Sequence, residues 1–526
     1  MGLVTIQALS ALLVLTAYAE CTSSDAPSSS THCCQALVDA GLGERVLFPD
    51  DALYQDAVDG HWSLEARLSP KCFVQPHDAG EVAKVVTTLV EANKTELCQF
   101  AIRSGGHQTW AGAANIEDGV TLDLAYMNST TYNPENATAS IQPGARWGGV
   151  YKTLDALGVA VPGGRAATVG VAGLATGGGN SFYGSREGFV CDNVIRFEVV
   201  LASGEIVEAD KDNNPDLWQA LKGGSGNFGV VTRLDMATLD GIDLWGGVVT
   251  YSNDTTQAQI EAMYNFGEEV TNDRYASAIS IWQYNTESDA NIIISAYDYT
   301  KPVPRPAIFD EFLAIPDNTS DSTRITNMTD LTVELEQTPG YRDNFYTITF
   351  KNNLEVMEEA IRMHHEYLET IQAADIAGNW TIQTMFQPIP SFFSEHSVEK
   401  GGNMLGLERF DDNLILWQTY LAWTEESLDE QFHTWGMNFI DELDSFAESK
   451  NASNPFIYLD YAYKAQVPLA SYGEENVKKM KAVAAKYDPE GVFQVMVPGG
   501  FKISRVGNGE GEDGAAAADK LKKREL

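Results

Sequence analysis

A basic residue, a serine, two glycines and a histidine, Arg103-Ser104-Gly105-Gly106-His107, follow a short apolar stretch at residues 100–102. The apolar stretch is typical of a strand, and the two glycines form a turn whose backbone N–H groups can approach an anion closely. A histidine beside such amides is placed to react with the molecule that carries the anion. In isolation the same five residues could form a surface hairpin with a solvated histidine. The rest of the sequence is needed to distinguish this hairpin from an anion-binding turn.

Glycine is dense between residues 144 and 229, where Val, Leu, Phe and Trp are interleaved with it. This mixture argues against a low-complexity segment and indicates repeated close approach of the backbone to something flat or charged. Residues 224–229 match G-x-G-x-x-G, but a dinucleotide-binding fingerprint needs a strand before the glycines and a helix after them. Here a helical pattern at 215–222 precedes them and a strand-like run at 230–232 follows, so we reject that fold.

The segments around the histidine predict a β-α-β-β order. Residues 72–76 have strand character, and residues 78–93 carry a helical apolar stripe with Asp78 as the cap. Two further strands are predicted at 100–102 and 120–124.

After about residue 240 the pattern changes. Tyr, Trp and Ile alternate with polar residues, which is typical of half-exposed antiparallel strands, and helical stretches intervene. The strands are expected at 245–251, 278–284 and 292–299, and the helices at 354–373 and 427–450. This part of the chain is therefore predicted to be an α+β domain built on an antiparallel sheet.

The chain has 526 residues and a formal net charge of −39. That length allows two or three domains. The charge argues against binding nucleic acid or anionic membranes, which select basic patches. It fits a soluble monomer outside the cell whose partners are small molecules. No apolar run after the N-terminal one is long enough to span a bilayer.

Residues 3–18 are almost uninterruptedly apolar, and Ala17-Tyr18-Ala19 is a small-x-small cleavage site. This predicts a secretory signal peptide removed after Ala19, and hence a secreted, extracellular protein. Eight Asn-x-Ser/Thr sequons agree with a glycoprotein. Their asparagines are Asn93, Asn128, Asn136, Asn253, Asn318, Asn327, Asn379 and Asn451.

Five of the six cysteines, Cys21, Cys33, Cys34, Cys72 and Cys98, lie in the first hundred residues, and only Cys191 lies beyond. In a secreted chain this clustering predicts disulfide bonds that staple the N-terminal region. We expect the pairs Cys34–Cys98 and Cys33–Cys72 with Cys191 reduced, while the connectivity is left open by the sequence. No cysteine has metal-ligand spacing with histidines, so no metal site is expected.

From about residue 70 to 239 the chain resembles the FAD-binding module of the vanillyl-alcohol-oxidase and p-cresol-methylhydroxylase (PCMH) superfamily, most closely the berberine-bridge-like oxidases. The similar stretches come in the family's order. They are residues 102–107, 121–124 with 127–128, 142–147, 161–180, 183–184, 188 with 192–194, 222–232, and near the C-terminus 458–461, 472–476 and 486–489.

The resemblance implies an α+β fold with a two-subdomain PCMH-type FAD-binding module and an antiparallel-sheet substrate domain with flanking helices. The expected organisation follows the chain in six parts. These are a signal peptide at 1–19, a lead-in at 20–67, the FAD-binding domain at 68–240, the substrate domain at 241–450, a segment returning to the FAD domain at 451–503, and a disordered tail at 504–526.

The resemblance also implies flavin contacts. His107 would bond FAD covalently, and the amides of Ser104 to His107 would hold the pyrophosphate. Relatives with a second covalent link carry a cysteine where this chain has Ala166, so the expected attachment is single. The full set of expected FAD-binding residues is Arg103, Ser104, Gly105, Gly106, His107, Gly170, Gly173, Gly177, Gly178, Gly179, Asn180, Asp192, Asn193, Asn227 and Gly229.

For the catalytic base, the resemblance points to Tyr458, Asp460 and Tyr461, with Tyr463 and Glu408 in reserve. Each aromatic here could equally be core packing on a strand. The run from 458 to 461 is expected to be strand-like, so that Tyr458 and Asp460 share one face. We expect Tyr458 to act as the base or as the residue that orients the base, with Asp460 tuning it.

The predicted function is a secreted FAD-linked oxidase that takes hydride from an alcohol, sugar or secondary-metabolite carbon and reduces O₂ to hydrogen peroxide. Two alternatives stay open. One is a biosynthetic flavin cyclase or dehydrogenase that uses O₂ poorly. The other is an inactive oxidase scaffold that serves as a binding glycoprotein.

Overall fold

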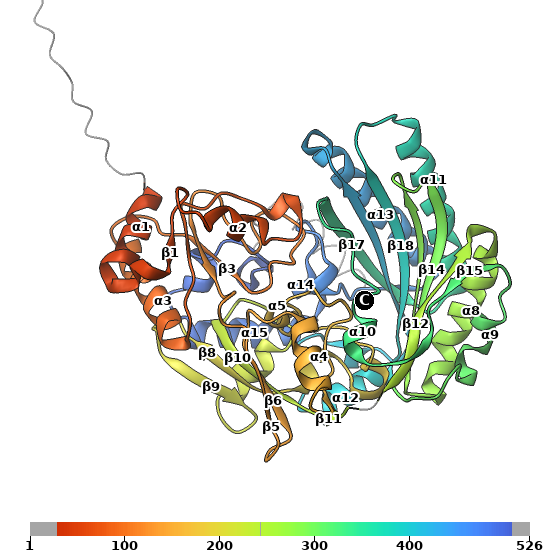
Figure 1. Cartoon of the computed structure of the whole chain (residues 1–526), viewed down its shortest axis with the longest axis horizontal. Coiled ribbons are helices and arrows are strands. Elements are labelled where there is room, and N and C mark those ends of the chain that lie inside the picture. The colour runs from red at the N-terminus through yellow and green to blue at the C-terminus, as the bar shows by residue number, and fades with distance from the viewer. Residues whose placement is uncertain (1–28, 242, 508–526) are drawn as a thin grey trace, which may run out of the picture.

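The computed structural model describes residues 29–241 and 243–507. They form two halves that face each other (Figure 1). The first half contains small sheets, and the second is built on one large sheet. The predicted signal peptide, Cys21 and most of the predicted disordered tail lie outside the described residues.

The β-α-β-β prediction is confirmed in a four-stranded sheet of order β1-β2-β4-β3. Strand β4 runs parallel to both β2 and β3, and β1 pairs antiparallel with β2. The Asp78 carboxylate caps α3 by accepting from the Glu81 amide at 2.8 Å, as expected from the sequence. The elements are β1 (Val46–Leu47), β2 (Cys72–Val74), α3 (Ala79–Asn93), β3 (Phe100–Arg103) and β4 (Val120–Asp123).

Two disulfide bonds attach helix α1 (Ser29–Leu37) to this sheet, but their pairing differs from our expectation. The bonds are Cys33–Cys98 and Cys34–Cys72, and Cys191 is a free, buried thiol. Neighbouring helical residues point about 100° apart. On α1 this difference directs Cys34 to strand β2 and Cys33 to the segment before β3. The rotation of a helix about its own axis cannot be read from the sequence, so the two pairings could not be distinguished.

A five-stranded antiparallel sheet of order β5-β6-β10-β8-β9 completes the first half. Helix α7 precedes strand β10, which is the helix-then-strand order that excluded the dinucleotide fold. The strands are β5 (Thr130–Asn133), β6 (Thr138–Ile141), β8 (Val194–Val200), β9 (Ile206–Asp210) and β10 (Val230–Ala237). The helices are α2 (Tyr54–Asp59), α4 (Trp147–Asp155), α5 (Val171–Gly177), α6 (Gly184–Glu187) and α7 (Pro215–Leu221), and β7 (Val159–Ala160) pairs with β11 (Leu239–Asp240).

The second half is a nine-stranded antiparallel sheet, as the alternation of apolar and polar residues predicts. Along the main path its order is β15-β12-β14-β13-β18-β19-β17-β20, and β16 pairs with β12. Its strands are β12 (Leu244–Ser252), β13 (Ala276–Asn285), β14 (Ala290–Tyr299), β15 (Asn318–Asp321), β16 (Arg324–Thr326), β17 (Arg342–Lys351), β18 (Trp380–Ile389), β19 (Leu414–Trp423) and β20 (Ser453–Asn454).

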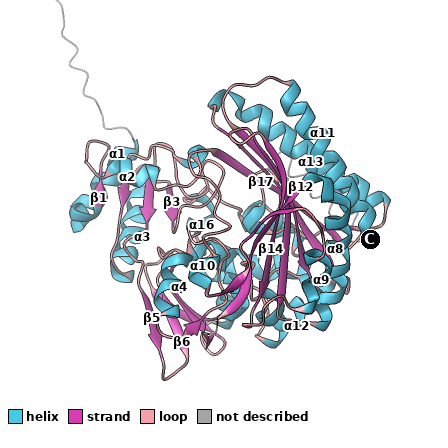
Figure 2. Ribbon diagram, turned by 45° about the vertical axis from the view of Figure 1, so that its right-hand side comes forward, coloured by secondary structure: helices cyan, strands magenta, loops and turns pink. Residues whose placement is uncertain are grey.

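Helices cover one face of this sheet, and the other face is turned toward the first half (Figure 2). Trp282 packs on Phe386 within the covered face, and Trp417 packs on Phe439 of α13. The helices of this half are α8 (Thr256–Glu269), α9 (Asp310–Leu313), α10 (Met328–Leu331), α11 (Leu354–Ala373), α12 (Phe392–Glu399) and α13 (Asp429–Ser449). Because strand side chains alternate between faces, the neighbours of these aromatic residues point toward the first half.

The last segment brings the chain back to the first half. The Phe100 amide donates to the Met496 carbonyl at 2.8 Å, and the Asn227 side chain donates to the Phe501 carbonyl at 2.9 Å. The helices of this segment are α14 (Pro468–Ser471), α15 (Glu474–Tyr487) and α16 (Val492–Val495). In the described part of the chain, no helix is both long and apolar enough to cross a membrane.

Candidate functional site

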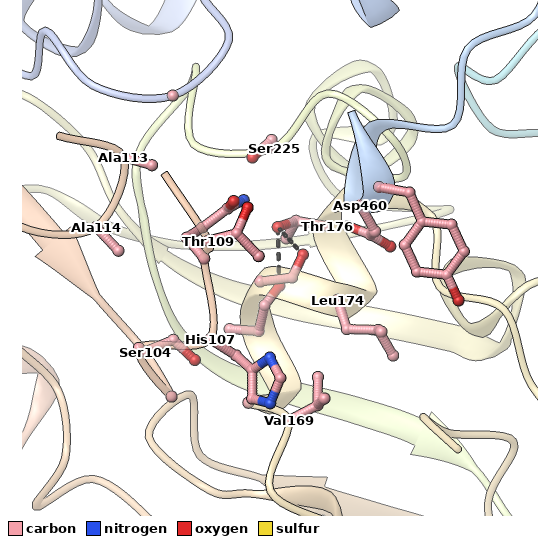
Figure 3. A pocket seen from close by; sticks show the side chains of 18 of the residues that line it. Ser104, His107, Thr109, Ala113, Ala114, Val169, Leu174, Thr176, Ser225 and Asp460 are labelled. Carbon is pink, nitrogen blue, oxygen red and sulfur yellow. Dashed lines mark hydrogen bonds between the residues drawn. The ribbon is translucent and has the colours of Figure 1, made fainter. Parts of the chain in front are cut away.

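A cavity of about 330 Å³ lies between the first half and the open face of the large sheet. That volume is within the range of about 300 to 1,000 Å³ of ligand-binding cavities. Figure 3 shows part of its wall, with His107, Val169 and Leu174 on one side and Asp460 nearby. The large sheet contributes a second wall, called here the sheet wall. It consists of Ile279, Ile281, Phe345, Met385, Gln387 and Gln418.

The turn after β3 presents free amides to this cavity. None of the backbone N–H groups of Ser104 to His107 donates to another described residue, and we call these four groups the amide nest. Gly106 has φ +67°, a conformation that favours glycine. A Cβ placed on Gly170 would lie only 2.5 Å from the Gly105 nitrogen, so the two loops touch through their backbones. The amide nest is thus a ready site for an anion such as a diphosphate.

His107 lines the cavity at the end of the amide nest. Its ring stacks on Trp62, with 4.4 Å between ring centroids, and its Nε2 lies 3.4 Å from the Thr168 hydroxyl. Burial, and then the positive charge of Arg146, lower the pKa of His107 to about 3. The imidazole is therefore neutral at pH 7, which is its nucleophilic form. The sequence reasoning missed Trp62, since no local pattern marks it.

Some of the expected flavin residues line the cavity and others lie behind it. Those that line it are Ser104, Gly105, Gly106, His107, Gly170, Gly173, Asn180 and Gly229. Arg103 lies behind the amide nest, where its guanidinium donates to the Ala57 carbonyl at 2.9 Å and pairs with Asp123 at 3.3 Å. Arg103 stabilises the turn that carries the amide nest and does not face the cavity.

The turn after α5 is tightly packed against other protein segments. A side chain on Gly177 would collide with Asp460, and one on Gly179 would lie 2.5 Å from Val190. Gly178 has φ +125° and faces Leu405. These three glycines were expected at the flavin, but they lie outside the cavity wall, and close protein packing explains why they are glycines.

Asp192, Asn193 and Asn227 also lie outside the cavity wall. The Asp192 carboxylate accepts from Asn403 at 2.9 Å and from Ser397 at 2.8 Å. The other two asparagine side chains donate to backbone carbonyls. All three are buried and tie loops together. The resemblance implied that these three residues contact the cofactor, and in the structure their side chains join protein loops outside the cavity wall.

The run at 458–461 is not a strand, which corrects our expectation. Residues Leu459–Tyr461 form a 3₁₀ turn, and this turn brings the Tyr458 hydroxyl to within 2.8 Å of Asp460, to which it donates. The Gly179 amide also donates to that carboxyl group at 3.1 Å. Both residues still line the cavity.

The electrostatics of this pair argue against Tyr458 as the base. Burial, and then the charge of Asp460, raise the pKa of Tyr458 well above its ordinary value of 10. A tyrosine that accepts a proton needs the opposite shift. Burial raises the pKa of Asp460 to about 7. The hydroxyl of Tyr458 thus keeps its proton and holds the Asp460 carboxyl group in place.

The two reserve candidates do not face the cavity. Glu408 is exposed on the surface. Tyr463 is buried against Tyr346, with 4.8 Å between ring centroids, and against His433. Neither is placed to take a proton from a molecule inside the cavity.

Comparison with known proteins places the chain in a family. The profile of the FAD binding domain matches residues 70–210. The FAD-dependent monooxygenase sdcF of Emericella nidulans is 42% identical over 479 residues, which cover 90% of this chain and 99% of that protein. The FAD-dependent monooxygenase drtC of Aspergillus calidoustus is 39% identical over 477 residues, covering 90% and 91%. The chain belongs to the family of FAD-dependent oxidoreductases that contains these monooxygenases.

Solved structures show the same fold at low sequence identity. The berberine bridge enzyme of Eschscholzia californica has a TM-score of 0.68 at 14% identity, covering 88% of this chain and 97% of that one. The berberine-bridge-like protein 1 of Physcomitrella patens has a TM-score of 0.70 at 19% identity, covering 88% and 97%. The expected α+β architecture of this oxidoreductase is thereby confirmed.

The residues of the oxidoreductase fit FAD. The amide nest lines the cavity and supplies four donors that have no partner among the described residues, which suits the diphosphate. Lys502 adds a cation. It is buried, lines the cavity and lies 3.5 Å from the Gly226 carbonyl. Burial, and then Arg505, lower the pKa of Lys502 to about 7. The sequence reasoning missed Lys502, although it directly follows the Gly499-Gly500-Phe501 stretch.

At the sheet wall, Arg165, Gln387 and Tyr461 form a group that we call the donor cluster. The Arg165 guanidinium donates to the Gln387 side-chain oxygen at 2.5 Å and to the Tyr461 oxygen at 2.8 Å. Tyr461 lies 3.5 Å from the same glutamine oxygen, to which it donates. Arg165 and Gln387 were not predicted, because strand β18 and the loop at 165 meet only in the folded chain.

Proposed function

We propose that the chain performs a biosynthetic oxidation, removing hydride from a carbon of a small secondary metabolite, and that it uses O₂ poorly. The supporting observation is the sheet wall. Four of its six side chains, Ile279, Ile281, Phe345 and Met385, carry no hydrogen-bonding group that would suit a sugar. The similarity to fungal FAD-dependent monooxygenases supports an oxidation of a secondary metabolite.

In this proposal FAD supplies the hydride acceptor. The amide nest and Lys502 hold its diphosphate, and the sheet wall holds the substrate. Tyr461 replaces Tyr458 as the residue that takes the substrate proton. Its oxygen lines the cavity and accepts a hydrogen bond from the Arg165 guanidinium, whereas the Tyr458 oxygen is committed to Asp460.

We also propose that His107 bonds FAD. Its neutral ring lies beside the amide nest. After acid precipitation of the native protein, the yellow colour should stay with the pellet, and with a His107→Ala variant it should pass into the supernatant. Free flavin released from the native protein would refute the attachment, and a flavin peptide containing Cys191 would refute its being single.

The reaction is tested by mixing the flavin-loaded protein with substrates without oxygen. Phenolic and polyketide-type alcohols should bleach the visible flavin band, and oligosaccharides should not. Rapid peroxide formation with a sugar would support the peroxide-producing oxidase instead. A protein purified from a flavin-replete host without any flavin band would support an inactive binding scaffold.

We further propose that the protein is a secreted, monomeric glycoprotein whose partners are its substrate and O₂, with O₂ acting as a slow acceptor of the electrons from the reduced flavin. The exposed sequon asparagines, Asn128, Asn136, Asn318, Asn379 and Asn451, support this. Expression in a eukaryotic host should place the protein in the medium, with an electrophoretic mobility that shifts on treatment with a glycosidase. An unshifted intracellular protein would contradict the proposal.

A further inference from the structure

The three residues of the donor cluster line the cavity, and the side-chain oxygen of Gln387 is already used within the cluster. The Gln387 oxygen is occupied by both Arg165 and Tyr461. This arrangement turns the Gln387 amide nitrogen away from them. That nitrogen is buried and has no hydrogen-bond partner among the described residues, and Gln387 is only 2% exposed. A buried donor without an acceptor is costly, so a ligand acceptor at this position would remove a penalty.

The charge of Arg165 is also unbalanced. Both of its hydrogen-bond partners are neutral, and it takes part in none of the ion pairs between described residues. One carboxyl group that its charge influences is that of Asp298, which forms no ion pair with it among the described residues, and burial raises the pKa of Asp298 well above its usual range. A guanidinium at a cavity wall that has no carboxylate paired with it among the described residues favours an anionic ligand.

The surroundings of the cluster are largely apolar. Phe345 packs on Tyr461 with 5.7 Å between ring centroids, and Ile281 and Met385 continue the wall. Gln418 adds a buried side-chain oxygen without a partner among the described residues. A planar ring can lie on such a wall while its acidic oxygen meets the donors.

We propose that the donor cluster binds the acidic oxygen of an aromatic substrate, a phenolate or a carboxylate, whose ring lies on Phe345 and the neighbouring sheet wall. This inference rests on the proposed function and names its substrate class. Arg165 supplies the charge, and Gln387 supplies the neutral donor. Tyr461 stays close enough to accept the proton that the substrate's alcohol hydroxyl loses when the carbon that carries it gives up hydride.

The test measures ligand binding through changes in the absorption of the bound flavin. The probes are benzoate, the phenolate of 4-cyanophenol, and neutral benzamide. We expect at least one anion to bind roughly 10-fold or more tighter than benzamide, as one charge-assisted hydrogen bond implies. Benzoate and the phenolate distinguish the two sources of the acidic oxygen. Equal binding of all three probes would overturn the proposal.

Variants assign the preference to the cluster. Arg165→Gln should remove the preference for the anion while benzamide still binds. Gln387→Glu should also remove the preference, because the new carboxylate pairs with Arg165 and neutralises its charge. Exposed Arg362, which pairs with Glu359 and Glu366 on α11, provides the control Arg362→Gln, which should keep the preference. If Arg165→Gln loses the flavin itself while Gln387→Glu keeps the anion preference, Arg165 serves the cofactor and the proposal is wrong. A native protein without flavin would instead refute the proposed function.

Discussion

The contact between Gly105 and Gly170 gives a sharp test of the amide nest. The two glycines belong to different loops, and their backbones touch at the cavity wall. A Cβ on Gly170 would lie 2.5 Å from the Gly105 nitrogen and 2.6 Å from its Cα. Both atoms are backbone, so no rotamer change can relieve the conflict.

The size of the effect follows from these distances. The loops must separate by about 0.9 Å for the nearest contact to reach the ordinary 3.4 Å. Overpacking of this kind costs about 1 to 3 kcal/mol of folding free energy. The movement also withdraws the Gly105 amide from the nest. Losing one hydrogen bond to a charged acceptor is worth about 1.5 to 3 kcal/mol, so the Kd for FAD should rise roughly 10- to 100-fold.

The assay is a titration of apoprotein with FAD, followed by quenching of flavin fluorescence, in a His107→Ala background where no bond to that residue can form. Gly170→Ala should weaken FAD binding in this background. Gly149→Ala is the matched control, because Gly149 is exposed on α4 with nothing within 4 Å of an added Cβ. That change should raise stability by up to about 1 kcal/mol and leave FAD affinity unchanged. Equal FAD affinity in the two variants would refute the assignment of the nest.

Three further predictions concern single groups. Tyr461→Phe should slow anaerobic flavin reduction by about 10²-fold or more, whereas Tyr458→Phe should change it only a few-fold; the reverse order would restore Tyr458 as the base. Lys502→Met should weaken FAD binding roughly 10-fold and leave the affinity for riboflavin, which has no phosphate, unchanged. Lys464→Met, at an exposed position, is the control. Equal losses of affinity for both flavins would refute a contact between Lys502 and the phosphate. Because burial raises the pKa of Asp460 from 3.8 to about 7, the folded apoprotein holds a proton that the unfolded chain has lost, and stability falls as pH rises between these values. The free energy of unfolding should fall by on the order of 4 kcal/mol over this range. Urea unfolding between pH 4 and pH 8 measures this fall, and Asp460→Asn should make the free energy of unfolding nearly independent of pH. The same pH dependence in the variant and the native protein would contradict the raised pKa.

The parts of the fold and site that could be predicted are those carried by contiguous residues. The amide nest is a run of four consecutive residues, and its glycines favour the turn regardless of the rest of the fold. The alternation of apolar and polar residues in strands such as β13 and β14 likewise predicts which face of each strand is buried. The cap at Asp78 belongs to the same class, since it needs only its own helix.

The parts that could not be predicted depend on pairs that meet only in the folded chain. Arg165 and Gln387 are 222 residues apart, and Trp62 reaches His107 from the lead-in. The strand expected at 458–461 failed for a related reason. Its alternating apolar residues suit a strand, but the buried hydrogen bond from Tyr458 to Asp460 is made by a turn.

The two walls of the cavity place different constraints on the sequence. The amide nest works through backbone donors, so it requires glycines and is insensitive to other side chains. The sheet wall works through side chains on alternate residues of β13 and β18. Ile281 and Met385 face the cavity, while their neighbours Trp282 and Phe386 pack on the covered face. A cavity-facing residue can therefore be exchanged without disturbing the core. The same fold can accept new substrates through such exchanges while it keeps its cofactor.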